Sequence, residues 1–283
     1  MQAEELPGFI DTWYRKMIRA IAHPTDFSAK GRSAFAHALS LALASRCPLD
    51  LLHVHGPHSQ DHYERFPHVR EVLVRWGMLG PHATIEDIEA TTGVRVRKVE
   101  IRDAHAADGL SQFLLSHHPD LLVMATHGRE GLNRWVRGSV SRELAHKLAA
   151  PVLFVGPNAR PFVDWNTGEM RLHDILVPID HEPVPLRALH SLKHLMKGMN
   201  ARIDIVHVGE EVPNLMDENG GTLHVRRLQG AVVERILEEA GTRHASLIAM
   251  PTAGHHAFLD AFRGRTTDQV IARAPCPVLT LPT

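Results

Sequence analysis

The stretch Asp120–Pro151, DLLVMATHGREGLNRWVRGSVSRELAHKLAAP, decides the fold. Leu121–Met124 is a short apolar run typical of a buried strand, and a loop begins at Thr126-His127-Gly128. A helical pattern opens at Gly138-Ser139-Val140-Ser141, where glycine permits close backbone approach and serine can cap the helix. Backbone amides and the positive end of the helix dipole then point into one space, so the stretch predicts an anion site. The alternative is a strand–loop–helix joint that binds nothing.

The composition favours a two-domain protein without a nucleic-acid or membrane partner. The 283 residues suffice for two ordinary domains, and 31 lysines and arginines nearly balance 32 aspartates and glutamates, so there is no overall basic field. The apolar runs are too short for a membrane span, and the N-terminus resembles no signal peptide. Cys47 and Cys276 lie far apart and do not suggest a disulfide scaffold. We therefore expect a cytoplasmic protein.

Strands alternate with helices along the chain, which predicts doubly wound parallel α/β sheets. In the first half the expected strands are 18–22, 49–55, 94–101, 121–124 and 151–155, and the expected helices are 31–45, 63–77, 85–91 and 107–116.

The same series then begins again, and constant offsets identify a repeat. Asp180 follows Asp26 by 154 residues, as His207 follows His53. Further on, the offset is 126 residues for Gly254 after Gly128, for Gly264 after Gly138 and for Pro277 after Pro151. The first copy therefore has 28 extra residues, which we place between its second and third strands.

The repeat sets the expected domain boundaries. We expect a first domain at 1–157 with a helical insertion near 56–93, and a second domain at 171–283. The proline- and glycine-containing segment from Gly156 to Gly168 serves as the linker.

The aligned copies resemble the tandem universal stress proteins. The resemblance rests on PTDFS at 24–28, LLHVH at 51–55, ATHGREGLNRWVRGSVS at 125–141 and PVLFV at 151–155, and it covers nearly the whole chain. It implies two homologous domains of the universal stress protein-like, adenine nucleotide alpha hydrolase-like class, packed as an internal pseudo-dimer. It also implies ATP as ligand, with Mg²⁺ arriving on its phosphates, and a homodimer through the terminal strands at 152–155 and 278–281.

The family motif is a glycine, two residues, a glycine, nine residues, then glycine and serine or threonine. Here the first glycine is Ala125, a mild departure. By resemblance, Asp26 contacts the nucleoside and the glycine loop holds the phosphates. The implied nucleotide-binding residues are Pro24, Asp26, Ala125, His127, Gly128, Arg129, Gly138, Ser139, Val140 and Ser141.

The second copy departs further from the motif. Pro251 replaces the most permissive glycine, and Arg265 replaces the serine at the helix start. Arg265 can pair with a phosphate or fill the pocket as the ligand's counter-ion, and we favour a degraded or altered site. Its residues are Asp180, Gly254, Gly264, Arg265 and Thr266.

Other chemistry has weaker support. The run His53, His55, His58, Asp61 and His62 matches no standard zinc spacing, and His53 recurs as His207, so we expect no metal site. The chain contains no GxxxxGK[ST], GxSxG or HExxH signature, which favours binding over catalysis. The expected function is ATP binding in a regulatory or stress-survival role. We expect the first domain to hold most of the nucleotide's contacts. The alternatives are a nucleotide-independent interaction scaffold and a weak ATPase.

Overall fold

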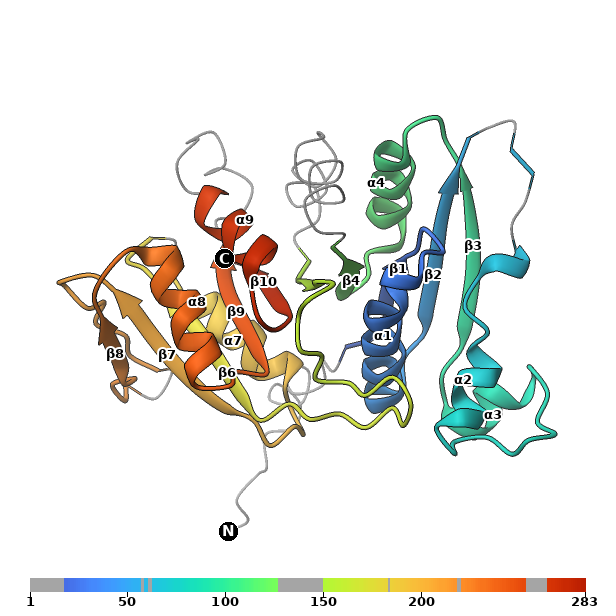
Figure 1. Cartoon of the computed structure of the whole chain (residues 1–283), viewed down its shortest axis with the longest axis horizontal. Helices are drawn as coiled ribbons and strands as arrows, with labels where there is room; N and C mark the ends of the chain where they lie inside the picture. Colours follow the sequence, from blue (N-terminus) through green and yellow to red (C-terminus); the bar gives the residue numbers. More distant parts are fainter. Residues whose placement is uncertain are drawn as a thin grey trace, which may run out of the picture.

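A computed structural model describes residues 18–56, 59–60, 63–126, 150–182, 184–217, 220–252 and 264–283. The first half, blue to green in Figure 1, contains strands and helices in alternation. They are β1 Ile21–Pro24, η1 Ala29–Gly31, α1 Arg32–Ser45, β2 Leu49–His55, η2 Tyr63–Arg65, α2 Val69–Arg75, α3 Asp87–Thr92, β3 Val96–Arg102, α4 Ala106–His117, β4 Leu121–Ala125 and β5 Val152–Val155.

The second half, yellow to red, repeats the pattern without the insertion (Figure 1). Its elements are β6 Asp174–Ile179, α7 Leu186–Leu195, β7 Arg202–Val208, β8 Val225–Leu228, α8 Val232–Thr242, β9 Leu247–Thr252, α9 Gly264–Arg273 and β10 Val278–Pro282. The expected α/β class is confirmed, and β1 begins three residues later than the sequence predicted.

The ten strands of the described residues form one sheet, in the order β3-β2-β1-β4-β5-β10-β9-β6-β7-β8. Every pair within a half is parallel, and the two halves meet where β5 pairs with β10 in antiparallel fashion. Leu153 lies opposite Leu279, which is its equivalent in the second copy at the offset of 126. A pseudo-two-fold axis therefore passes through this residue pair, and the internal pseudo-dimer is confirmed.

This junction corrects one expectation. β5 pairs with β4 on its other side, and β10 pairs with β9, so both edges of each terminal strand are occupied within the chain. The prediction that two chains pair through the terminal strands is wrong, because neither strand has an edge left for a second copy. The terminal strands, which the resemblance implied as a pairing surface, pair with each other inside this chain.

The strand registers repeat with the copies. Ile21 pairs with Leu49 and Leu121, and its equivalent Ile175 pairs with Ile203 and Leu247. The third strands differ by one residue: Leu51 pairs with Lys98, whereas Ile205 pairs with Val225, an offset of 127. Of the 28 extra residues in the first copy, 27 therefore lie between β2 and β3, and one lies between β3 and α4. The sequence placed all 28 before β3.

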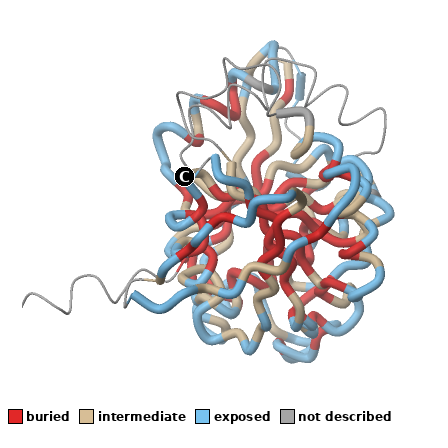
Figure 2. The backbone as a smooth tube through the Cα atoms, turned by 90° about the vertical axis from the view of Figure 1, so that its left-hand side faces the viewer, coloured by how far each residue is buried: buried red, intermediate tan, exposed pale blue. Residues whose placement is uncertain are grey.

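Successive side chains along each strand point to opposite faces of the sheet, so a continuous apolar strand serves a core on both faces. In β4, Leu121 and Val123 belong to the core under α1, while Leu122 and Met124 belong to the core under α4. The core under α1 continues across the junction to Ala188, Leu189 and Leu192 of α7. Figure 2 shows the buried parts of the chain gathered in the interior of the molecule. One hydrophobic core therefore joins the two halves.

The linker packs as a strap along the first half. Trp76 Nε1 donates a hydrogen bond to the carbonyl oxygen of Trp165 at 2.9 Å, and the Ser40 hydroxyl donates to that of Gly168 at 3.3 Å. The Arg75 guanidinium lies 4.7 Å from the centroid of the Trp165 ring, within cation–π range. The strap thus connects α1 and α2 (Figure 1).

Among the described residues, none of the helices has the length and apolar character that crossing a bilayer requires.

Candidate functional site

The strand order places one candidate site in each half. After β1 the chain proceeds outward through β2 and β3, then returns to form β4 on the other side of β1. The gap between the carboxyl ends of β1 and β4 is therefore a topological switch point, where open α/β sheets bind ligands. Pro24 ends β1 and Ala125 ends β4, so two of the predicted residues flank this point.

Asp26 lies in the turn that leaves β1, and it is exposed. Its Oδ1 accepts a hydrogen bond from the Ser28 amide at 2.9 Å, and the Thr25 hydroxyl accepts one from the Phe27 amide at 3.1 Å. Ser28 makes no side-chain capping bond to the following helix. These local bonds hold the Asp26 carboxylate at the sheet edge, and they leave it exposed to solvent.

His23 connects the two strands that carry the site. Its Nδ1 donates to the Val123 carbonyl oxygen at 2.9 Å, and the side chain is buried. Burial lowers the pKa of His23 to about 4, against the smaller raising effects of the Val123 bond and the Asp26 charge. At physiological pH the His23 side chain is therefore neutral, and its hydrogen bond connects β1 to β4.

The insertion packs against the residue that follows Asp26. Phe27 adopts φ of 63°, in the left-handed region that non-glycine residues rarely enter. Its ring packs against His53 in a tilted arrangement with centroids 3.9 Å apart, and it meets Phe66 of the insertion edge-on at 5.1 Å. The Arg65 guanidinium lies 5.0 Å from the centroid of the Phe27 ring. The 27-residue insertion thus borders the first site.

The rest of the predicted phosphate cradle lies outside the described residues. This holds for His127, Gly128, Arg129, Gly138, Ser139, Val140 and Ser141, and for Gly254 of the second copy. In the histidine-rich run, His58, Asp61 and His62 also lie outside, whereas His53 lies within β2 and His55 is its last residue.

The second copy places its predicted residues at equivalent positions. Asp180 follows β6, Gly264 is the first residue of α9, and Arg265 and Thr266 come next in the first turn. Pro251 lies within β9, opposite Leu281 of β10. The recurring histidines, His53 and His207, make equivalent structural bonds. Nδ1 of each donates to a backbone carbonyl oxygen near the end of the neighbouring strand: Thr25 at 2.8 Å and Ile179 at 3.0 Å.

The second copy also contains a grouping that the sequence reading missed. His181 follows Asp180, and its side chain approaches His207 with ring centroids 5.5 Å apart. Asp180, His181 and His207 each offer a donor atom, and these atoms lie within 4.8 Å of one another. The available sequence signal was the 154-residue offset, which aligns His181 with Phe27 and so shows a histidine where the first copy has an apolar ring.

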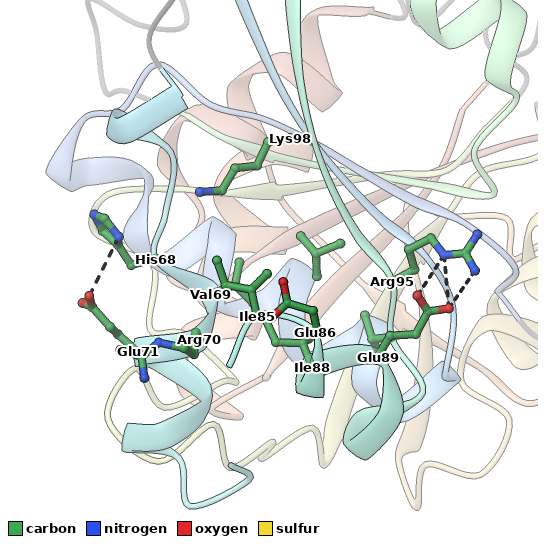
Figure 3. A pocket seen from close by; sticks show the side chains of 12 residues that line it. His68, Val69, Arg70, Glu71, Ile85, Glu86, Ile88, Glu89, Arg95 and Lys98 are labelled. Atoms are coloured by element: carbon green, nitrogen blue, oxygen red, sulfur yellow. Dashed lines mark hydrogen bonds and ion pairs between the residues drawn. The ribbon is translucent and has the colours of Figure 1, made fainter. Parts of the chain in front are cut away.

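A cavity of about 430 Å³ lies away from both switch points. Helices α2 and α3 of the insertion and the outer strand β3 enclose it, and it has an apolar base with charged side chains at its rim (Figure 3). Arg95 is held there by Glu89, with Nη2 2.8 Å from Oε1. Burial lowers the pKa of Lys98, which points into the same space. This cavity belongs to the insertion and is separate from the predicted nucleotide site.

Fold and site together define a class: a tandem α/β protein with two doubly wound halves, a carboxylate at each switch point, and an internal pseudo-two-fold axis. The model of the Universal stress protein family matches residues 17–156 and 214–282. The chain belongs to the universal stress protein family.

Individual relatives agree with this assignment. A universal stress protein of Thermus aquaticus is 30% identical over 130 residues, covering 37% of this chain and 95% of that protein. One from Methanocaldococcus jannaschii is 25% identical over 143 residues, covering 40% and 84%. The solved universal stress protein of Archaeoglobus fulgidus superposes with a TM-score of 0.62 at 21% identity, over 94% of this chain and 97% of that one. The first two match about one copy, and the third matches the whole fold.

Proposed function

We propose that this chain is an ATP-binding universal stress protein with a regulatory or stress-survival role, and that the first half holds the nucleotide. Asp26 would accept a hydrogen bond from the ribose or adenine. The loop after Ala125 would hold the phosphates, with Mg²⁺ bound mainly through phosphate oxygens.

The observation that carries the proposal is the position of Asp26. An exposed carboxylate lies at the switch point between β1 and β4, and the glycine motif begins at the end of the adjacent β4. Asp26 and Ala125, the first residue of the motif, therefore lie at the same gap in the sheet, which supports a nucleotide site there. Membership of the universal stress protein family adds independent support.

Binding is favoured over rapid catalysis. In the described part of the first site, the titratable groups near the switch point include Asp26, the buried neutral His23 and His53, and they form no nucleophile–base–orienter set. We expect hydrolysis, if measured, to be slow. We also propose a cytoplasmic location, and any assembly between chains would use a surface other than β5 and β10.

Isothermal titration with ATP and Mg²⁺ tests the proposal. We expect one ATP per chain, and an Asp26→Ala variant that binds at least about tenfold more weakly because a charge-assisted hydrogen bond is lost. Gly138→Trp should abolish binding by filling the cradle. Asp180→Ala is the matched variant of the second copy and should keep wild-type ATP affinity.

The melting temperature of each variant without nucleotide verifies that the fold is intact. Absence of ATP binding by the wild-type protein would overturn the proposal. Loss of affinity in Asp180→Ala with none in Asp26→Ala would move the nucleotide to the second half.

A further inference from the structure

The residue that follows the switch-point aspartate has a different backbone conformation in each copy. In the first copy Phe27 has φ of 63°, in the left-handed region. His181, its equivalent at the 154-residue offset, does not have a positive φ. A residue with a Cβ atom is disfavoured in the left-handed region, and such an outlier beside a ligand site indicates a constraint with a functional role.

The left-handed conformation of Phe27 belongs to the turn that holds the Asp26 carboxylate. Asp26 Oδ1 accepts a hydrogen bond from the amide of Ser28, two residues further on, at 2.9 Å. A turn closed by an aspartate side chain in this way mimics a β-turn, and a positive φ inside a β-turn favours glycine or asparagine. Phenylalanine is therefore an unfavourable choice here, unless other contacts stabilise it.

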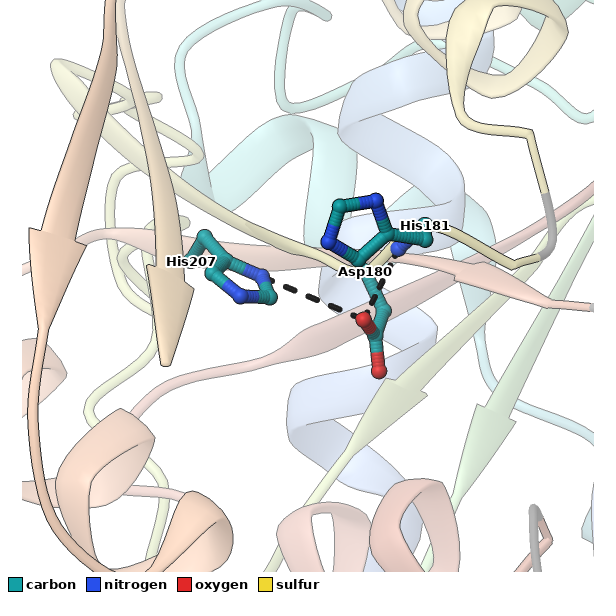
Figure 4. A group of neighbouring side chains, drawn as sticks. All are labelled: Asp180, His181 and His207. Carbon is teal, nitrogen blue, oxygen red and sulfur yellow. Dashed lines mark hydrogen bonds and ion pairs between the residues drawn. The ribbon is translucent and has the colours of Figure 1, made fainter. Parts of the chain in front are cut away.

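The second copy holds its aspartate in another way. Asp180 Oδ1 accepts a hydrogen bond from the amide of the next residue, His181, at 2.8 Å. The same oxygen lies 4.0 Å from Nδ1 of His207, and Figure 4 shows both interactions. The equivalent carboxylates of the two copies are thus fixed by different backbone amides.

The insertion supplies the contacts that stabilise Phe27. Phe66 is fully buried, and its ring meets the Phe27 ring edge-on with centroids 5.1 Å apart. The Arg65 guanidinium lies 5.0 Å from the centroid of the Phe27 ring, within cation–π range. Arg65 and Phe66, which we call the Phe27 clamp, lie between β2 and β3, where the first copy has its 27 extra residues. The clamp is therefore a feature of the first copy.

The histidine that packs against Phe27 recurs in the second copy and does not explain the difference. His53 Nδ1 donates to the Thr25 carbonyl oxygen at 2.8 Å. In the second copy, His207 Nδ1 donates at 3.0 Å to the carbonyl oxygen of Ile179, the residue equivalent to Thr25. This bond is common to both halves, so the clamp is what distinguishes the turn of the first half.

We propose that the Phe27 clamp positions Asp26 for the nucleotide by holding Phe27 in its left-handed conformation. Phe27 is thus a positioning residue, which acts through the carboxylate beside it. The insertion thereby selects the first half for ATP, although both halves carry an aspartate at the switch point. This inference rests on the proposed function, because it assigns a cause to the preference for the first half.

Isothermal titration with ATP and Mg²⁺ tests the clamp. Phe66→Ala removes the edge-on ring, and Phe27→Val disfavours the left-handed conformation while leaving Phe66 in place. Each variant should bind ATP at least about fivefold more weakly, because a smaller fraction of the protein has Asp26 in position. His181→Val is the matched variant of the second copy and should keep wild-type affinity. Melting temperatures without nucleotide verify that each variant is folded.

Rescue by glycine distinguishes positioning from packing. Glycine enters the left-handed region freely, so Phe27→Gly combined with Phe66→Ala should restore the ATP affinity to within about twofold of wild type. If Phe66 contributes only to packing, or if the Phe27 ring itself contacts ATP, the double variant should stay as weak as Phe66→Ala. That result would contradict the proposal.

Hydrogen exchange at the Ser28 amide provides a readout without nucleotide, because this amide donates to Asp26. By NMR, exchange should be faster in Phe66→Ala and Phe27→Val than in the wild-type protein, and should approach that of Asp26→Ala, which lacks the acceptor. A wild-type protein that binds no ATP would refute the proposed function. Wild-type affinity and wild-type exchange in both clamp variants would refute this inference alone.

Discussion

His23 and His37 are titratable side chains enclosed by the apolar interior of the first half, with 1% and 0% of their surface exposed. Burial lowers the pKa of each to about 4, partly opposed by bonds to the carbonyl oxygens of Val123 and Ser33. In the unfolded chain both would take up a proton near pH 6.5. The unfolded state therefore binds more protons between pH 6.5 and 4, and stability falls as the pH is lowered through this window.

The predicted loss between pH 7 and pH 5 is about 2 kcal/mol per histidine. Urea unfolding at the two pH values measures it. In His37→Leu the loss should be smaller by about that amount, and His82→Leu, at an exposed position, should leave it unchanged. Equal pH dependence in His37→Leu and the wild-type protein would contradict the prediction.

The two thiols should be unreactive in the folded protein. Burial raises the pKa of Cys47 to about 12 and that of Cys276 to about 12, and both side chains are at most 2% exposed. Because the thiolate is the reactive form, an aromatic disulfide reagent at pH 8 should label neither residue rapidly. In urea it should label two thiols per chain. Fast labelling without denaturant would show that one of them is accessible.

At the scale of elements, the strap between the halves depends on Gly168. This residue has φ of +71°, and a Cβ atom there would lie 2.4 Å from the Trp76 ring. Gly168→Ala should destabilise the protein by about 1 kcal/mol through the left-handed backbone and by about 1–3 kcal/mol more through overpacking.

Gly198 provides the matched control for the backbone contribution. Its φ is +87°, and an added Cβ would meet nothing within 4 Å. Gly198→Ala should therefore cost only the backbone part, about 1 kcal/mol. Urea unfolding of both variants isolates the contact between the strap and Trp76. Equal losses would show that this contact does not contribute.

The elements also show what could be predicted from sequence. The offsets of 154 and 126 residues that the sequence showed recur in the strand registers: Ile21 pairs with Leu49 and Leu121, and Ile175 pairs with Ile203 and Leu247. The strap could not be predicted in this way, since Trp76 and Trp165 meet only in the folded chain. The Asp180–His181–His207 grouping was missed because His181 lacks a counterpart of its own kind in the first copy.

At the scale of the whole molecule, the core under α1 and α7 crosses the β5–β10 junction. We therefore expect one cooperative unfolding transition. Tryptophan fluorescence, which includes Trp76 and Trp165, should coincide with far-UV circular dichroism of the whole chain. Leu153→Ala, at a side chain 2% exposed on the pseudo-two-fold axis, should cost roughly 2–5 kcal/mol and shift both probes together. A second step seen only by circular dichroism would indicate independent halves.

The antiparallel junction between Leu153 and Leu279 has a consequence for how the copies differ. Two identical subunits related by true symmetry must carry identical pockets, and they separate on dilution. Here the partners are parts of one polypeptide, so their association is independent of protein concentration. Fusion also frees each half to change alone, so the residues around Asp180 can diverge from those around Asp26 while the two halves stay paired.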